Sequence, residues 1–326
     1  MARHWTVTRS TGILPGLKPA PFDYLAPRSL DEALAALAQA RAPADGETKL
    51  LAGGQSLVPL LNFRLATPRR LVDLNRVPGL SYIREQDGGF AIGAMTRQSA
   101  VERDARLAAG VPLLGEAMPW VGHLAIRSRG TLGGSLAHAD PAAELPAVAV
   151  CLDARFTLVG PRGQRTVAAD EFFVDYLTTR LEPDEILTEA WFPRVPAGTG
   201  QAWLEFARRH GDFALAGVGV SLSLADERVT EARIALTGVG ARPLRARQAE
   251  QVLAGGRLAE RMQAAVEAVR ASLDPPADIH ASSEYRLHLA GVLVERALNL
   301  AYQRARERSA AALDVGRMLD QHARRA

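Results

Sequence analysis

The chain has 326 residues, of which 48% are hydrophobic and 23% are charged, a composition typical of globular proteins. This length exceeds that of one small domain and predicts two or three packed units. The net charge is only +3, and the 39 Lys and Arg residues are spread along the sequence rather than gathered in one basic cluster. Composition therefore favours a folded, multidomain protein and argues against a nucleic-acid partner.

Residues 1–20 contain several Gly and Pro residues and no apolar periodicity, so we expect an N-terminal arm or a partner-docking tail rather than a core element. Ser29 and Glu32 match a capping box, and the leucines behind them predict a helix over about residues 30–41. Short apolar runs at 49–52 and 70–74 predict strands. Residues 21–80 should therefore form a first small α/β subdomain.

The next segment has the pattern of a second α+β subdomain over residues 81–196. A hairpin is predicted over 82–94, turning at Asp87-Gly88-Gly89, and a helix over 98–107. Strands are expected at 154–159, 164–168 and 186–192.

A cluster of Pro and Gly from Pro193 to Gly200 predicts a domain boundary. Beyond it, long alternating strands are expected at 216–224 and 231–238, followed by a helix capped by Ser283. We expect a C-terminal domain over 201–312 and a tail over 313–326. Three arginines should lie at the solvated end of that helix: Arg304, Arg306 and Arg308.

Cys151 is the only cysteine, which excludes an internal disulfide framework and any iron–sulfur cluster held by this chain alone. Its apolar neighbours predict a buried, unreactive thiol. No stretch reaches the roughly eighteen apolar residues of a membrane span, and the N-terminal region lacks a signal-peptide h-region. We therefore expect no membrane span and a cytoplasmic location.

Two glycine-rich segments follow apolar runs: Ala52-Gly53-Gly54-Gln55-Ser56-Leu57 and Thr131-Leu132-Gly133-Gly134-Ser135. Consecutive glycines can aim several backbone N–H groups at one anion, and the hydroxyls add further donors. Each segment alone is compatible with a simple tight turn. Together they fit the two phosphates of a dinucleotide.

Other nucleotide and hydrolase motifs are missing. The chain contains no G-x-G-x-x-G that opens a helix and no P-loop, so a Rossmann dehydrogenase and a P-loop NTPase are disfavoured. It also has no serine nucleophile elbow and no H-E-x-x-H. A metal site at His138, Asp140 and Glu144 is disfavoured because their spacing matches no standard site.

The stretches 51–66, 71–76 and 127–141 closely resemble the FAD-binding medium subunit of the xanthine dehydrogenase and aerobic carbon monoxide dehydrogenase family. The resemblance runs from about Phe22 to the C-terminal helix. It implies an α+β chain with a vanillyl-alcohol-oxidase (PCMH)-type FAD-binding fold in two subdomains, followed by a C-terminal domain of antiparallel sheet and helices.

The resemblance also implies the cofactor and its contacts. FAD is expected on this chain, with its pyrophosphate held mostly by backbone donors of the two glycine segments. No residue is expected to be catalytic and none to bind a metal. The implied FAD contacts are Ala52, Gly53, Gly54, Gln55, Ser56, Leu57, Val121, Thr131, Gly133, Gly134, Ser135, Glu144, Leu187, Asp212 and Phe213.

Three of these contacts carry open questions. Glu144 is equally compatible with an ordinary surface acid. Asp212 and Phe213 resemble the family segment beside the isoalloxazine, although Phe213 is also compatible with a core position. Family members often carry a lysine a few residues upstream, where this chain has Trp203-Leu204-Glu205-Phe206, so lysine-based tuning of the flavin potential is in doubt.

By resemblance, the chain passes electrons within a molybdenum hydroxylase. A large molybdopterin-binding subunit and a small [2Fe–2S] subunit are the expected partners, as a dimer of heterotrimers, with NAD or oxygen as the acceptor. Purines, N-heterocycles, aldehydes and carbon monoxide all remain open as substrates. The alternatives are a stand-alone flavin oxidoreductase of the same fold and a scaffold subunit with no redox role.

Overall fold

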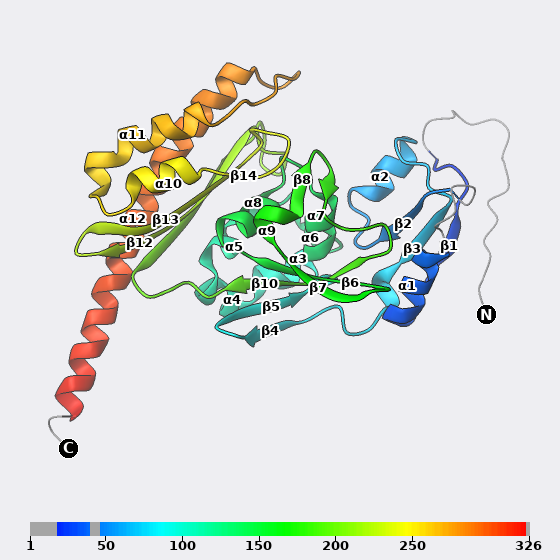
Figure 1. Cartoon of the computed structure of the whole chain (residues 1–326), viewed down its shortest axis with the longest axis horizontal. Coiled ribbons are helices and arrows are strands. Elements are labelled where there is room, and N and C mark those ends of the chain that lie inside the picture. Colours follow the sequence, from blue (N-terminus) through cyan, green and yellow to red (C-terminus); the bar gives the residue numbers. More distant parts are fainter. Residues whose placement is uncertain (1–17, 40–45, 324–326) are drawn as a thin grey trace.

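The computed structural model describes residues 18–39 and 46–323, with side chains described as far as Ser309. The chain forms three consecutive parts, running from β1–β3 through the sheet β4–β7 with β10 to the C-terminal sheet and its helices (Figure 1). Most of the expected N-terminal arm, residues 1–17, lies outside the described residues.

The first part is a parallel three-stranded sheet in the order β1-β3-β2. The Ser29 hydroxyl accepts the Glu32 amide at 3.1 Å, which confirms the predicted helix start. The Glu32 carboxylate accepts the amide of Arg28 at 2.7 Å. The elements of this part are β1 (Asp23–Leu25), α1 (Leu30–Ala38), β2 (Thr48–Leu51), α2 (Leu57–Asn62), β3 (Arg70–Asp73) and η2 (Leu74–Arg76).

The second part is built on an antiparallel sheet in the order β4-β5-β10-β6-β7. The predicted hairpin is confirmed, with Asp87 and Gly88 at φ of 51° and 72° in its turn. The three predicted later strands are confirmed as well. The strands of this part are β4 (Ile83–Gln86), β5 (Gly89–Gly93), β6 (Arg155–Gly160), β7 (Gly163–Ala168), β8 (Phe173–Asp175), β9 (Thr178–Thr179) and β10 (Ile186–Pro193).

The prediction of a single helix over 98–107 is wrong, because the helix is interrupted at Asp104. The carboxylate of Asp104 accepts the amides of Arg106 at 2.9 Å and Leu107 at 3.2 Å, and so caps a new helix. The helices of this part are α3 (Gln98–Arg103), α4 (Ala105–Gly110), α5 (Pro112–Ala117), η3 (Met118–Trp120), α6 (Leu124–Arg127), α7 (Leu132–His138), α8 (Glu144–Cys151) and α9 (Ala169–Phe172).

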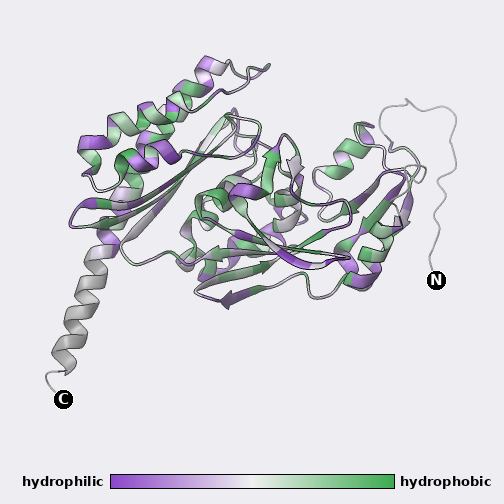
Figure 2. Ribbon diagram, in the orientation of Figure 1, coloured by the Kyte–Doolittle hydropathy of each residue, from purple (hydrophilic) through white to green (hydrophobic). Residues whose placement is uncertain are grey.

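The third part is an antiparallel sheet in the order β11-β12-β13-β14, with helices packed on it. Its strands are β11 (Thr199–Phe206), β12 (Ala216–Ala225), β13 (Arg228–Thr237) and β14 (Leu244–Arg245), and its helices are α10 (Arg247–Leu253), α11 (Leu258–Ala271) and α12 (Ser283–Ala323). Strand β11 was missed, because the sequence analysis predicted no strand between the boundary segment and residue 216. Hydrophobic and hydrophilic residues alternate along α10 and α11, as expected for helices with one packed face (Figure 2).

Two predictions for the last helix are corrected by the structure. Its cap is Ser282 rather than Ser283, since the Ser282 hydroxyl accepts the amide of Tyr285 at 3.2 Å. The helix also continues to Ala323, through most of the expected tail, and residues 324–326 lie outside the described range. Arg304 is therefore not at a helix end, and its guanidinium binds both carboxylate oxygens of Glu116 on α5 at 2.7 and 2.8 Å.

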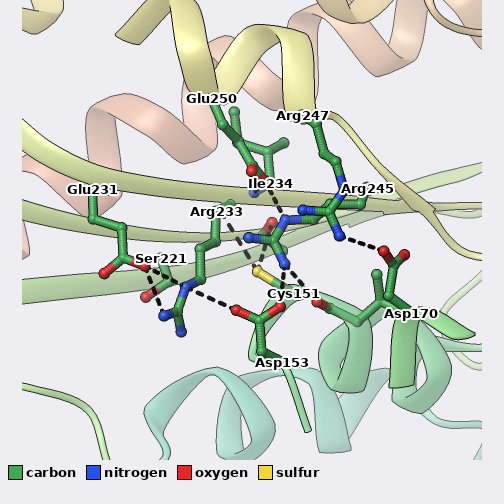
Figure 3. Close-up of polar contacts among 12 residues, drawn as sticks. Cys151, Asp153, Asp170, Ser221, Glu231, Arg233, Ile234, Arg245, Arg247 and Glu250 are labelled. Carbon is green, nitrogen blue, oxygen red and sulfur yellow. Dashed lines mark hydrogen bonds and ion pairs between the residues drawn. The ribbon is translucent and has the colours of Figure 1, made fainter. Parts of the chain in front are cut away.

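Helix α8 joins the second and third parts, because it is fully buried and packs against β12, β13 and β14. At its end, Arg245 of β14 donates to the carbonyl of Val150 at 2.9 Å. Arg245 also donates to the carboxylate of Asp153 at 2.7 Å (Figure 3). The Arg245 guanidinium also binds the carboxylate of Glu250. A buried arginine with three acceptors thus fixes the C-terminal sheet on the core of the second part. None of the helices in the described part of the chain combines the length and hydropathy needed to span a bilayer.

Candidate functional site

The first glycine segment, Ala52–Ser56, connects β2 to α2 and is half-buried throughout. Gly54 has φ of 75°, a backbone conformation that favours glycine. Among the described residues, the amides of Gly53, Gly54, Gln55 and Ser56 have no acceptor, and the Ser56 hydroxyl has no partner. The segment therefore presents several free donors close together, as an anion site requires.

The second glycine segment, Thr131–Ser135, is not a free loop but the cap and first turn of α7. The Thr131 hydroxyl accepts the amide of Gly134 at 3.0 Å, and its carbonyl accepts that of Ser135 at 3.2 Å. The amides of Leu132 and Gly133 donate to the carbonyls of Thr96 at 3.0 Å and Ala94 at 2.8 Å. Its amides from Leu132 to Ser135 are therefore already satisfied inside the protein.

The fold brings the two segments into direct contact. A Cβ on Gly53 would lie 2.4 Å from the carbonyl oxygen of Arg129, and one on Gly134 would lie 3.3 Å from the Cβ of Ala52. Only glycine at position 53 permits this approach. The free donors of the first segment thus lie beside the second segment.

These residues fit the diphosphate of a dinucleotide cofactor. Unpaired amides and hydroxyls are the donors that phosphate oxygens accept, and bare glycine backbone lets the ligand come close. In the second segment, Gly133 contributes close packing, since a Cβ there would lie 2.4 to 2.7 Å from atoms of Ala94. Its amide is not available as a donor.

The other residues predicted to line the site are divided between core and surface. Val121 and Leu187 are buried in the main core, and the carbonyl of Val121 accepts Arg127 at 3.1 Å. Asp212 is exposed, and Phe213 is 63% exposed, which rules out a core position for that ring. Phe213 is available to stack on a ligand or a partner.

Glu144 is not a surface acid, because it is only 5% exposed at the start of α8. It interacts with a second buried acid, Glu205 of β11, which is 7% exposed. Glu205 accepts the Trp203 indole N–H at 3.2 Å through Oε2, whereas its Oε1 has no hydrogen-bond partner among the described residues.

Burial raises the pKa of both carboxyls, since it disfavours the charged form. The charge of Asp140 raises the pKa of Glu144 further, and Arg127 opposes this, while the charge of Glu144 raises the pKa of Glu205. The two acids therefore hold protons to higher pH than exposed carboxyls do.

Metal binding gains no support at His138, Asp140 and Glu144. Within the described ranges, no group of three or more His, Cys, Asp or Glu side chains is arranged to hold a metal ion. Burial lowers the pKa of His138, so the imidazole tends to be neutral.

Two polar residues beside the site were not predicted. Asn75 and Arg97 follow strands β3 and β5, respectively. The Asn75 side chain donates to the carbonyl of Ala52 in the first segment, and the backbone of Arg97 forms a β-bridge with Thr131 in the second. Their positions as polar side chains shortly after predicted strands are the sequence signal that could have found them.

The fold and this site define a class, the FAD-binding subunits of oxidoreductases. Residues 20–195 match the family model "FAD binding domain in molybdopterin dehydrogenase", and residues 201–301 match "CO dehydrogenase flavoprotein C-terminal domain". The chain therefore belongs to the FAD-binding subunits of the xanthine dehydrogenase and carbon monoxide dehydrogenase family of molybdenum hydroxylases, and its cofactor is FAD. The predicted family and α+β fold class are thus confirmed.

Individual relatives match over most of their lengths. The 6-hydroxypseudooxynicotine dehydrogenase complex subunit alpha of Paenarthrobacter nicotinovorans is 42% identical, over 89% of this chain and 97% of its own. The carbon monoxide dehydrogenase medium chain of Hydrogenophaga pseudoflava is 40% identical, over 88% and 99%. A solved structure of carbon monoxide dehydrogenase from Hydrogenophaga pseudoflava, which lacks the Mo-pyranopterin moiety, superposes with a TM-score of 0.85 at 41% identity, over 88% of this chain and 99% of that one.

Proposed function

We propose that this chain is the electron-transfer subunit of a heteromeric molybdenum hydroxylase. In this function its FAD receives electrons from [2Fe–2S] clusters of a small partner subunit and delivers them to NAD or oxygen. A large partner subunit would carry the molybdenum cofactor and oxidise the substrate. Bound FAD supplies the redox chemistry, because a flavin exchanges electrons singly or in pairs.

The observation that carries this proposal is the set of amides in the first glycine segment that have no acceptor among residues 18–39 and 46–323, placed against the second segment. We propose that these amides and the Ser56 hydroxyl hold the FAD diphosphate. Gly133 and Gly134 would let the cofactor lie close to α7, and Asp212 and Phe213 would lie beside its ring system. Ala52, Gln55, Leu57, Val121, Thr131, Ser135, Glu144 and Leu187 complete the proposed contacts.

The single thiol of the chain supports a partner as the source of electrons. Cys151 is fully buried, and burial raises the pKa of its thiol to about 12, so it is an inert core residue. A cluster held by four thiolates must then belong to another chain. The names of the relatives, "medium chain" and "complex subunit alpha", are those of proteins in multisubunit assemblies. We propose a dimer of heterotrimers in the cytoplasm.

We also propose the division of the chain into an arm (1–20), two FAD-binding subdomains (21–80 and 81–196), a C-terminal domain (201–312) and a tail (313–326). The separate sheets of the three parts support the internal boundaries.

The test is to purify the assembly through a tag on this chain and to measure its FAD, iron and molybdenum. We expect FAD at one per chain, with iron and molybdenum in the partners. After reduction with dithionite, the assembly should be reoxidised by NAD or oxygen. This reoxidation should stop when the FAD-binding chain is removed from the assembly. A chain that oxidises a donor without partners would point to a stand-alone oxidoreductase, and an assembly without flavin would point to a scaffold.

A further inference from the structure

Asn75 links the first glycine segment to the end of strand β3. Its side-chain N–H group donates to the carbonyl of Ala52 at 2.8 Å and to the carboxylate of Asp73 at 2.5 Å. Its side-chain oxygen accepts the Arg97 guanidinium at 2.6 Å. An amide side chain can donate and accept at once, and no carboxylate can replace it in both roles.

Arg97 continues this link to the second glycine segment. Its guanidinium donates to the carbonyl of Arg129, two residues before Thr131, and its backbone forms a β-bridge with Thr131. The amide of Gln98 donates to the carbonyl of Gly130 at 3.0 Å. The carbonyl of Arg129 that Arg97 holds is the same group that closely approaches Gly53.

The link is anchored in the sheet of the first part. The carboxylate of Asp73, which is buried, accepts the amide of Asn75 at 2.9 Å and the hydroxyl of Tyr24 on β1. A continuous chain of hydrogen bonds therefore runs from β1 through Asp73, Asn75 and Arg97 to Arg129, two residues before the second segment. Hydrogen bonds that share polar groups in this way reinforce one another.

The charge of the link suits a site for an anion. Burial and the nearby charge of Arg129 lower the pKa of Arg97, although a guanidinium stays protonated. Two neighbouring cations repel each other, and a diphosphate between the segments would relieve this repulsion.

We propose that Asn75 and Arg97 are positioning residues that hold the two glycine segments at the spacing required by FAD before FAD binds. This inference rests on the proposed role of the segments in binding the FAD diphosphate. A site held in its bound geometry binds more tightly, because less conformational freedom is lost on binding. Loss of the link should therefore weaken FAD binding without unfolding the chain.

The test combines FAD affinity with a direct measurement of the spacing. Spin labels are placed on Val58→Cys and Ala125→Cys, both at exposed positions. They report the distance between α2, which follows the first segment, and α6, which precedes the second. The native Cys151 is buried and should not react. With Asn75 and Arg97 intact, we expect a narrow distance distribution with and without FAD.

Arg97→Met should broaden the distribution of the FAD-free chain and raise the FAD dissociation constant by about tenfold to a hundredfold, while FAD should narrow the distribution again. Arg97→Lys should rescue little, because a lysine cannot bond both acceptors in the same fork. Asn75→Asp should behave like Arg97→Met, since it loses the donor to Ala52. Arg106→Met is the control, because that exposed guanidinium pairs with Asp104 away from the segments.

The outcomes separate this inference from the proposed function. Weaker FAD binding by Arg97→Met with an unchanged distance distribution would overturn positioning and assign Arg97 to direct contact with the cofactor. Unchanged affinity and unchanged distances would also overturn it. If the distances broaden but the chain with both residues intact binds no FAD, the link is supported and the proposed function fails. Melting temperatures of all variants confirm that they are folded.

Discussion

The two glycine segments look alike in sequence but differ in structure. In the first, between a strand and a helix, the amides from Gly53 to Ser56 have no acceptor in the part of the chain that the structure describes. The second, Thr131–Ser135, uses its amides from Leu132 onward to start α7 and to bond the carbonyls of Thr96 and Ala94, just after β5. Similar strings of glycine and serine therefore supply donors in one place and close backbone packing in the other.

Because of this difference, the two segments should contribute to FAD binding in different ways. A segment with free amides can bind an anion strongly, because the donors would otherwise be left unpaired in a half-buried position. A segment with satisfied amides contributes shape and rigidity. Substitutions in the second segment should therefore affect mainly stability, and those in the first mainly affinity for FAD.

Gly133→Ala should give the largest effect on stability. The added Cβ would lie within 2.7 Å of backbone and side-chain atoms of Ala94, which cannot move without disturbing β5. Overpacking of this kind lowers the free energy of unfolding by about 1–3 kcal/mol. Urea unfolding of the FAD-free chain measures this loss.

Gly115→Ala is the matched control, because a Cβ on Gly115 meets only ordinary contacts at 3.6 Å in helix α5. That variant should be as stable as the unmodified chain or more stable. Equal stability of the Gly133→Ala and Gly115→Ala variants would show that the second segment is not rigid. The two glycine segments would then not differ in the way described above.

A pH dependence should arise downstream of the second segment, at Glu144 and Glu205. Their folded-state pKa values are raised, so the folded chain binds more protons than the unfolded chain above the ordinary carboxyl pKa of about 4.3. The contribution of this pair to stability should therefore be full in acid and be lost as pH rises through neutral and alkaline values. The charged groups facing the pair, Asp140 and Arg127, are intact in each variant below.

Glu205→Gln should flatten this decline, since a glutamine resembles the neutral acid and cannot ionise. Melting temperatures between about pH 5 and about pH 9 should diverge, with the Glu205→Gln variant more stable at the alkaline end. Glu144→Gln should act in the same direction, because it removes the partner charge. Parallel curves for the unmodified chain and both variants would mean that the pair is not a source of the pH dependence.

The fold was predictable where local patterns decide the structure. The Ser29–Glu32 capping box, the Asp87-Gly88 turn and the alternating strands of the C-terminal sheet all depend on neighbours in sequence. Strand β11 and the break at Asp104 were not predicted. The first is fixed by pairing with β12, and the second by a side chain that competes with the helix for backbone amides.

The candidate site was predictable only in part, for a similar reason. The two glycine segments and their family were recognised from the sequence, but the occupied amides of the second segment depend on carbonyls of Thr96 and Ala94, far along the chain. The buried pair Glu144 and Glu205 joins α8 to β11, and no local pattern marks such a pair. Long-range contacts decided which predicted residues are available to a ligand.

Ser56→Ala should give the smallest effect and the cleanest separation of binding from folding. The Ser56 hydroxyl has no partner among the described residues, so its loss should leave the free energy of unfolding of the FAD-free chain within about 0.5 kcal/mol. One lost hydrogen bond to FAD should cost about 1 kcal/mol, or roughly fivefold in the dissociation constant. Flavin fluorescence titration measures that constant.

Ser272→Ala is the control, because it removes a hydroxyl bonded to Val269 in the C-terminal domain. It should leave the FAD dissociation constant unchanged. Equal FAD affinities in all three proteins would remove Ser56 from the site and leave the free amides as the donors of the first segment.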